Sequence, residues 1–169
     1  KQKTTEAINL TKALKSQNKT QGDWGEMILS SILDQTGLRE GKEYTIQGSF
    51  NDTEGKRLRP DVIVHLPSKK DIVIDSKVSL NSYIAYCKTE NEAHKETASK
   101  ELVKSITAHI KALSSKRYEE IEGVRTLDFV LMFIPVEGAF ILATSTDDSL
   151  FKMAFEHNIM LVSPSTLYV

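Results

Sequence analysis

The stretch that decides the fold is RPDVIVHLPSKKDIVIDSKVSL, residues 59–80, in which two apolar runs flank a short polar turn. Two such runs around a turn predict a pair of antiparallel strands joined as a hairpin. Each run also carries an aspartate among its apolar residues. Asp61 opens the first run, and Asp75 interrupts the second, shortly before Lys77. Charged groups inside strands that look buried need a chemical reason.

The length of the turn predicts which residues of the two strands face each other. Pairing Leu66 with Lys70 and continuing away from the turn sets Asp61 directly opposite Asp75. Because side chains alternate between the two faces of a strand, Lys77 shares the face of Asp75 and lies diagonally near Asp61. A slip of one residue in this register would send the two aspartates to opposite faces.

Two opposed carboxylates destabilise a sheet unless a cation lies between them. Mg²⁺ is the natural cation, because it prefers oxygen ligands and is often held by one or two carboxylates together with phosphate oxygens. Lys77 could orient a water molecule or stabilise charge on a phosphate. The pattern therefore predicts metal-dependent hydrolysis of a phosphodiester. In the alternative, Asp61 caps its strand, and Asp75 and Lys77 form an ion pair at the sheet edge.

The composition of the chain is that of a soluble globular domain: 169 residues, 40% hydrophobic and 27% charged. The net charge of −1 means that any binding of DNA must rely on local positive charge. Cys87 is the single cysteine, which favours a reducing compartment, and we expect a cytoplasmic protein. No apolar stretch reaches the roughly 18 residues that a bilayer span requires, and the four histidines lack the spacing of a zinc site.

The remaining pattern predicts an α/β fold with a mixed central sheet flanked by helices. A helix begins at Gly22 or Asp23 and ends at Gly37, and one helical region spans about 80–118. We expect strands at 43–50, 58–66, 71–79, 127–135 and 159–163, with further helices at 137–145 and 148–158. The order is α-βββ-α-β-α-β, an antiparallel meander followed by a helical crossover into further strands.

Two regions differ in character along the chain. Residues 1–20 are polar and helix-permissive, and we expect them to be a lead-in, such as the end of an upstream coiled coil. Residues 21–169 form the predicted domain. Its last residues, SPSTLYV, are apolar and carry no polar cap, so we expect the domain to be truncated at its C-terminal end.

At the aspartates the chain becomes similar to a known family. RPD (59–61) followed by DSK (75–77) resembles the PD-(D/E)xK nuclease signature. The blocks GDWGEMIL, EYTIQ, RPDVIVHLP, IVIDSKVSLNSY, LDFVLMFIPVEGAF and IMLVSPSTL resemble, in order, those of the RmuC family of bacterial DNA recombination proteins. The resemblance runs from about residue 21 to residue 169.

The resemblance implies a PD-(D/E)xK, restriction-endonuclease-like fold and a Mg²⁺- or Mn²⁺-dependent nuclease acting on DNA, including branched recombination intermediates. It implies that the family limits rearrangements between DNA repeats. The metal ligands would be Asp61, Asp75 and Glu26, and Lys77 would position the attacking water. It also implies an upstream membrane anchor and an upstream coiled coil, through which the protein could form homo-oligomers. The alternative function is a weakly active or inactive DNA-binding or scaffolding module.

Several other residues are candidates for the site, each with a simpler reading. Glu26 heads an apolar helical stripe, but it could merely be a first-turn glutamate favoured by the helix dipole. Gln47 could face the site or solvent, Glu137 could line its mouth or begin a helix, and Tyr83, with Asn81, could touch substrate or pack in the core. Candidates for phosphate contacts, or simply for solubility, are Lys56, Arg57, Arg59, Lys69, Lys70, Lys111, Lys116 and Arg117. His109 and Trp24 are expected to be core residues.

Overall fold

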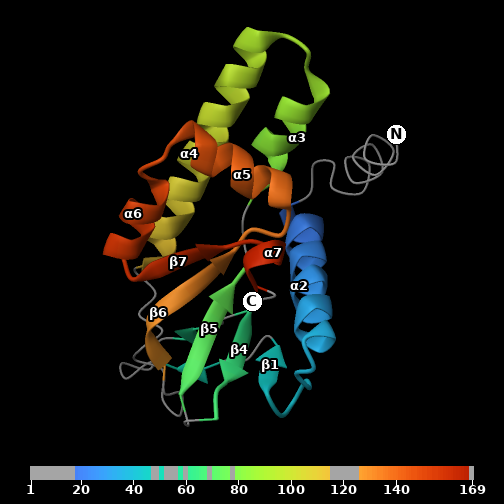
Figure 1. The fold of residues 1–169 in the computed structure, drawn as a ribbon, viewed down its shortest axis with the longest axis vertical. Coiled ribbons are helices and arrows are strands. Elements are labelled where there is room, and N and C mark those ends of the chain that lie inside the picture. The colour runs from blue at the N-terminus through green and yellow to red at the C-terminus, as the bar shows by residue number, and fades with distance from the viewer. Residues whose placement is uncertain are drawn as a thin grey trace.

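A computed structural model describes residues 18–46, 50–51, 57–58, 61–67, 70–76, 79–114 and 126–167. Its centre is a five-stranded mixed sheet in the order β1-β4-β5-β6-β7 (Figure 1). The strands of this sheet are β1 (Tyr44–Ile46), β4 (Val62–His65), β5 (Asp71–Asp75), β6 (Thr126–Phe133) and β7 (Ile159–Val162). A separate two-stranded sheet joins β2 (Phe50–Asn51) to β3 (Arg57–Leu58). The prediction of an α/β fold with a mixed central sheet is confirmed.

The hairpin register that the turn predicted is confirmed. β4 and β5 pair antiparallel with Val62 opposite Ile74 and His65 opposite Asp71, and the N–H of Leu66 donates to the carbonyl of Lys70 at 2.8 Å. β1 pairs antiparallel with β4, so the first three strands of the central sheet form the expected meander. β5, β6 and β7 are parallel to one another, as expected for strands reached through helical crossovers.

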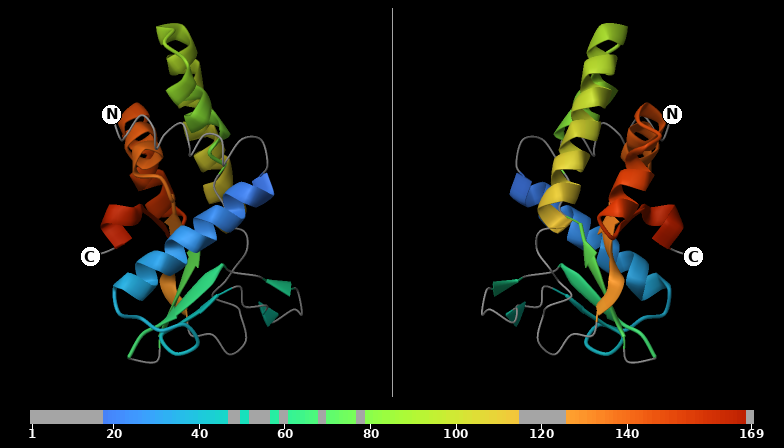
Figure 2. Two further views of the ribbon diagram at one scale, coloured as in Figure 1. Left: turned by 90° about the vertical axis from the view of Figure 1, so that its right-hand side faces the viewer. Right: turned by 90° about the vertical axis from the view of Figure 1, so that its left-hand side faces the viewer.

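Helices cover both faces of the sheet (Figures 1 and 2). One face packs against α4 (Glu92–Ser114), α5 (Glu137–Thr146) and α6 (Leu150–Glu156). The other packs against α2 (Asn18–Gln35), with α7 (Pro164–Leu167) beside it. α3 (Asn81–Lys88) packs on α4, and Figure 2 shows these two helices projecting as a hairpin beyond the sheet.

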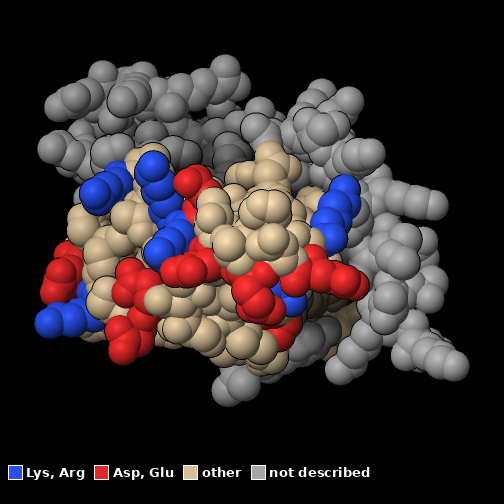
Figure 3. All heavy atoms as spheres, turned by 90° about the horizontal axis from the view of Figure 1, so that it is seen from above, with Lys and Arg blue, Asp and Glu red and all other residues tan. Residues whose placement is uncertain are grey.

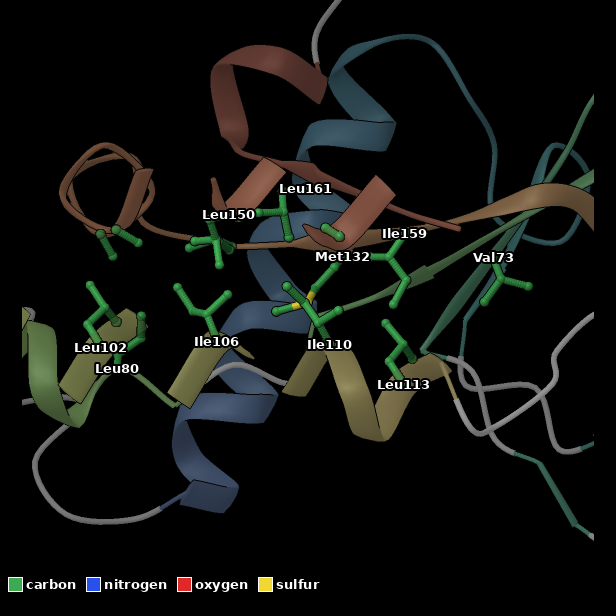
Figure 4. Packing of buried hydrophobic residues seen from close by; sticks show 14 of the residues in the cluster. Val73, Leu80, Leu102, Ile106, Ile110, Leu113, Met132, Leu150, Ile159 and Leu161 are labelled. Carbon is green, nitrogen blue, oxygen red and sulfur yellow. The ribbon is translucent and has the colours of Figure 1, made fainter. Parts of the chain in front are cut away.

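Alternation along the strands divides the apolar residues between two cores. Ile63, Val73 and Met132 belong to the core under α4. The buried residues that α4 contributes to this core follow a helical stripe, and Figure 4 shows Ile110 of this stripe facing Met132 of β6. The stripe includes Leu102, Ile106, Ile110 and Leu113. Val62, Ile74 and Phe133 point to the other side, toward Leu29 and Leu33 of α2. Both faces of the middle strands are therefore buried, which explains their nearly continuous apolar sequence.

Three predictions about helices and strands are wrong in detail. The helical region 80–118 is not one helix, because it breaks at 89–91 and Asn91 caps α4 by accepting the N–H of His94 at 3.1 Å. Gly22 and Asp23 do not begin a helix, because both lie inside α2. The strand predicted at 43–50 is divided between β1 and β2, and Leu58, the first residue of the strand predicted at 58–66, lies in β3.

The predicted end of the helix at Gly37 is confirmed. This glycine has φ of +92°, and its N–H donates to the carbonyl of Asp34 while the N–H of Leu38 reaches back to Leu33. Glycine adopts this left-handed conformation without the steric cost of a side chain. Among the described residues, no helix is both long enough and apolar enough to cross a membrane. The lead-in predicted for 1–20 falls almost wholly outside the described residues.

Candidate functional site

The two aspartates of the hairpin lie at the same end of the sheet. Asp75 is the last residue of β5, and Asp61 directly precedes β4, so the observed register continues to the pair Asp61 and Asp75. Both are buried, with exposed fractions of 2% for Asp61 and 0% for Asp75. Asp75 pairs with Met132 of β6, which belongs to the core under α4, so the carboxylates lie on that face.

Ser76 holds the carboxylate of Asp61. Its backbone N–H donates to Oδ2 of Asp61 at 2.8 Å, and its hydroxyl lies 3.3 Å from the same oxygen. Ser76 is itself buried and directly follows Asp75. The end of β5 is thereby joined to the start of β4, so the backbone that carries one aspartate orients the side chain of the other.

His109 brings a third ionisable side chain to the pair, this time from a helix. Its Nε2 lies 3.5 Å from Oδ1 of Asp75. The prediction of a core histidine did not anticipate this contact with Asp75. The signal was present in the sequence, because His109 is a polar residue in an otherwise apolar stripe of α4. Periodicity alone did not reveal what lies opposite that stripe.

The helix turn that carries Glu26 lies against the same end of the sheet. A side-chain carbon placed on Gly25 would sit 3.5 Å from the carbonyl oxygen of Ser76 and 3.5 Å from Cγ of Pro135. These are ordinary van der Waals distances, so α2 packs beside the backbone at the ends of β5 and β6. Glu26, which is partly buried, follows directly. The expectation that α2 delivers Glu26 to the aspartates stays a prediction.

Among the side chains described at this site, the two aspartates are the ones that suit a hard cation such as Mg²⁺. Within the ranges that the structure describes, no group of three or more histidine, cysteine, aspartate or glutamate side chains is arranged to hold a metal. Mg²⁺ does not require such a group, because it commonly keeps several waters and binds one or two carboxylates plus substrate phosphates. Asp61 and Asp75 fit that mode. The role of Glu26 as a third ligand stays a prediction.

Glu137 and Tyr83 lie near this end of the sheet with structural partners. Glu137 begins α5, and its Oε1 accepts the N–H of Ser165 at 2.9 Å. Burial raises the pKa of Glu137, but hydrogen bonds from Ser165 and Ser163 outweigh it, and the pKa is lowered. Tyr83 packs against the core under α4, with its hydroxyl against Gly138. Asn81 is exposed at the start of α3.

Comparison with known proteins identifies the family. The RmuC family profile matches residues 1–169. The chain belongs to the RmuC family. It is 52% identical to the "DNA recombination protein RmuC homolog" of Yersinia pestis and 51% identical to "DNA recombination protein RmuC" of Escherichia coli K12, in each case over 164 residues, 97% of this chain and 34% of that protein. The homolog of Pseudomonas aeruginosa is 47% identical over 162 residues, 96% of this chain and 36% of that protein. The chain therefore spans about a third of these relatives.

Most of the cationic candidates of this RmuC-family chain lie outside the described residues, together with two candidates of the site. These are Lys77, Gln47, Lys56, Arg59, Lys69, Lys116 and Arg117, and only the backbone of Arg57 is described, in β3. Lys70 is exposed at the turn of the hairpin, the opposite end of β5 from Asp75. At about 3.3 Å per strand residue, the two are about 17 Å apart. Lys111 is exposed in the last turn of α4.

The charged surface at the α3–α4 end of the RmuC-family chain is mixed. Figure 3 shows basic and acidic side chains of the described residues interspersed there. Lys100 and Glu96, for example, form an exposed ion pair at 3.0 Å on α4. This face of the described part of the chain therefore offers no uniformly positive surface for a nucleic acid.

A second polar cluster joins β1, β4 and β5 at the turn end of the hairpin. His65 lies between two partners, with Nδ1 2.8 Å from Oδ1 of Asp71 and Nε2 2.9 Å from Oγ1 of Thr45. These contacts connect three adjacent strands on one face. They favour the register that sets Asp61 opposite Asp75 at the other end.

Proposed function

We propose that this RmuC-family chain is a Mg²⁺-dependent DNA nuclease domain of the PD-(D/E)xK type, acting in DNA recombination by hydrolysing phosphodiester bonds. The observation that carries the proposal is the buried pair Asp61 and Asp75, opposed in the register of β4 and β5. A chain that buries two facing carboxylates incurs a large electrostatic cost, which a bound divalent cation offsets. The relatives' printed name, "DNA recombination protein", supports DNA as the substrate.

The architecture supports the PD-(D/E)xK assignment. An antiparallel meander that continues into parallel strands, with helices on both faces, agrees with the fold that the sequence signature implies. The proposed site lies at the end of β5, next to the ends of β6 and β7. In open α/β sheets, ligands bind outside the carboxyl ends of the parallel strands. The location of Asp75 and of the loop after β6 follows that rule.

Each residue of the proposed site has a distinct role. Asp61 and Asp75 would hold the cation, and Glu26, one residue after the close contact of α2 with Ser76, would complete its surroundings. Bound there, Mg²⁺ would act as a Lewis acid on the phosphate and make water a stronger nucleophile. Lys77 would donate a hydrogen bond to the attacking water or to the phosphate, which is the role that the sequence signature predicts for it.

The surroundings of the aspartates suit this chemistry. Both carboxylates are shielded from solvent by the core under α4, and electrostatic interactions are stronger where water is excluded. Ser76 fixes the carboxylate of Asp61 through its N–H at 2.8 Å, so little reorganisation is needed when a cation arrives. A preorganised pair of this kind binds a cation at lower entropic cost than two mobile side chains.

A second function, a non-catalytic module that binds or scaffolds DNA, is favoured by a specific observation. The structure describes no group of three or more candidate ligands, and Oδ2 of Asp61 already accepts the N–H of Ser76. In this case Asp61 would act as a structural acceptor that joins two strands. The chain would then bind DNA without cutting it, and binding would survive the loss of Asp75.

The experiment that separates the two functions is a DNA cleavage assay with and without Mg²⁺ or Mn²⁺. Wild type, Asp75→Asn and Lys77→Ala are compared on duplex, single-stranded and branched DNA. Asp148→Asn is the matched control, because Asp148 is an exposed carboxylate beyond α5. The nuclease proposal expects cleavage by wild type and Asp148→Asn that is reduced at least 100-fold in the other two variants. Equal cleavage by all four proteins, or DNA binding without cleavage in any metal, contradicts it.

A further inference from the structure

We propose that His109 is a positioning residue that orients the carboxylate of Asp75 for metal binding. The inference rests on the proposed function, because Asp75 is the proposed metal ligand. His109 belongs to α4, and its Nε2 lies 3.5 Å from Oδ1 of Asp75. This contact joins α4 to the end of β5, two elements that are distant in sequence.

The environment of the imidazole points to a specific partner. Nε2 of His109 is buried and has no hydrogen-bond partner among the described residues. A buried polar atom without a partner is costly, and native proteins rarely tolerate one without a reason. The separation of 3.5 Å is only a few tenths of an ångström beyond a normal N–H···O bond. A small rotation of either side chain would let Nε2–H donate to Asp75.

Both groups are held by rigid elements, so their relative position is well defined. Asp75 lies in the sheet between β4 and β6, and its backbone pairs with Met132. His109 is adjacent to Ile110, which is fully buried, and Ile106 one turn earlier is also buried. Figure 4 shows these isoleucines directed at the sheet. A donor carried by such a helix can restrict the rotamer of Asp75 without contacting the metal.

The two aspartates would then be oriented by different elements. Ser76 donates to Asp61 from the end of β5, and His109 approaches Asp75 from α4. Partners that hydrogen-bond to metal ligands tune the orientation and basicity of those ligands, and their loss commonly lowers metal affinity or activity about 10-fold to 100-fold. The packing of α4 on the sheet would thereby influence the proposed site.

The test measures the affinity of the chain for Mn²⁺ alone, without DNA, from the electron paramagnetic resonance signal of the free ion. Wild type is compared with His109→Leu, which removes the donor, and His109→Gln, which retains an N–H donor at a similar reach. His94→Leu is the control, because His94 is an exposed histidine of the same helix. Thermal unfolding of each protein reports whether it is folded.

We expect His109→Leu to bind Mn²⁺ about 10-fold or more weakly, and His109→Gln to recover most of the affinity. His94→Leu should bind as wild type does. Unchanged affinity in His109→Leu overturns the inference. So does equal loss in both His109 variants, which would indicate a role in packing. A wild type that binds no Mn²⁺ overturns it as well.

The ring nitrogens give a second, independent readout. Long-range ¹H–¹⁵N spectra of the wild type should place the proton of His109 on Nε2 and keep it there when Mg²⁺ is added. An unprotonated Nε2 whose resonance shifts on addition of Cd²⁺ would make His109 a direct metal ligand and overturn the positioning role. DNA cleavage separates this inference from the proposed function. If the wild type cleaves DNA and His109→Leu binds Mn²⁺ as tightly as the wild type does, only the positioning role is refuted. If His109→Leu binds Mn²⁺ more weakly but the wild type never cleaves DNA, only the nuclease proposal is refuted.

Discussion

The backbone N–H of Ser76 donates to Oδ2 of Asp61 at 2.8 Å, across the end of the β4–β5 hairpin. This bond gives Asp61 a structural task in addition to its proposed chemical one. Any variant that removes the carboxylate therefore alters two properties at once, the stability of the hairpin end and the binding of a cation. The two properties respond differently to different substitutions.

Asp61→Asn and Asp61→Ala should separate these tasks. Alanine leaves the buried N–H of Ser76 without its acceptor, at a cost of about 1–3 kcal/mol of unfolding free energy. Asparagine retains an amide oxygen that can accept the same bond, so we expect a smaller loss of stability. Both variants lack the negative charge, so both should lose Mn²⁺ affinity. Urea denaturation and Mn²⁺ titration of the same preparations check the two effects.

Stability and Mn²⁺ affinity each offer an outcome that would contradict these two roles of Asp61. If Asp61→Asn is as unstable as Asp61→Ala, the bond to Ser76 does not stabilise the hairpin end as argued. If Asp61→Asn binds Mn²⁺ with wild-type affinity, Asp61 does not act as a metal ligand.

Gly25 provides a steric prediction for the position of α2. An added methyl group would meet Ser76 and Pro135 at 3.5 Å, which is ordinary van der Waals contact. Because alanine also favours a helix by up to about 1 kcal/mol over glycine, Gly25→Ala should be neutral or stabilising. Gly25→Leu cannot fit and should destabilise by about 1–3 kcal/mol. Thermal unfolding measures both effects.

A matched control for Gly25 is Gly37. Its surroundings are open, but φ is +92°, so Gly37→Ala should destabilise through backbone strain by roughly 1 kcal/mol. The two alanine variants therefore have opposite expected signs. Equal losses of stability in the two alanine variants would contradict the ordinary contacts expected for a methyl group at Gly25.

The register of the hairpin that carries the two aspartates was predictable because it depends on local information. The length of the turn between Leu66 and Lys70, together with the alternation of side chains, was enough to fix the register of β4 and β5. The buried inner strands of the sheet were also predictable from local sequence, because an apolar run of strand length indicates a strand that is covered on both faces.

The role of His109 was not predictable in the same way. Its place on the stripe of α4 indicates burial, but the identity of its neighbour depends on how α4 packs on the sheet. Periodicity contains no information about the residue on the opposite surface. The break at 89–91 was missed because helical periodicity continues on both sides of it. Gly22 and Asp23 were misread because a residue type that favours a helix start is only a weak indicator and also occurs inside helices.

Truncation of Ile110 tests the contribution of the core under α4. Ile110 is fully buried between α4 and the sheet, so Ile110→Ala should cost about 2–5 kcal/mol of unfolding free energy. Ile141 is 55% exposed on α5, and Ile141→Ala should change stability by no more than about 0.5 kcal/mol. Chemical denaturation of both variants gives the comparison. Similar losses in the two would contradict the burial pattern.

Tyr83 should make the stability of the chain depend on alkaline pH. Burial, supported by a hydrogen bond to Cys87, raises the pKa of Tyr83 to about 12, whereas an unfolded tyrosine titrates near about 10. The folded state therefore favours the neutral phenol. Its contribution to stability is fully present below about pH 10 and is lost as the pH rises toward about 12. The unfolding free energy of wild type should accordingly fall between about pH 10 and about pH 12.

Tyr83→Phe removes the ionisable hydroxyl, so its stability should fall less over the same range. Tyr86→Phe is the control, because Tyr86 lies in the same helix and its ring faces Lys95 instead of the core. This variant should retain the wild-type dependence on pH. Burial also raises the pKa of Tyr44, so some alkaline destabilisation should persist in Tyr83→Phe. Urea denaturation of the three proteins measures the effect, and identical slopes in Tyr83→Phe and wild type would show that the Tyr83 hydroxyl is not held neutral by the fold.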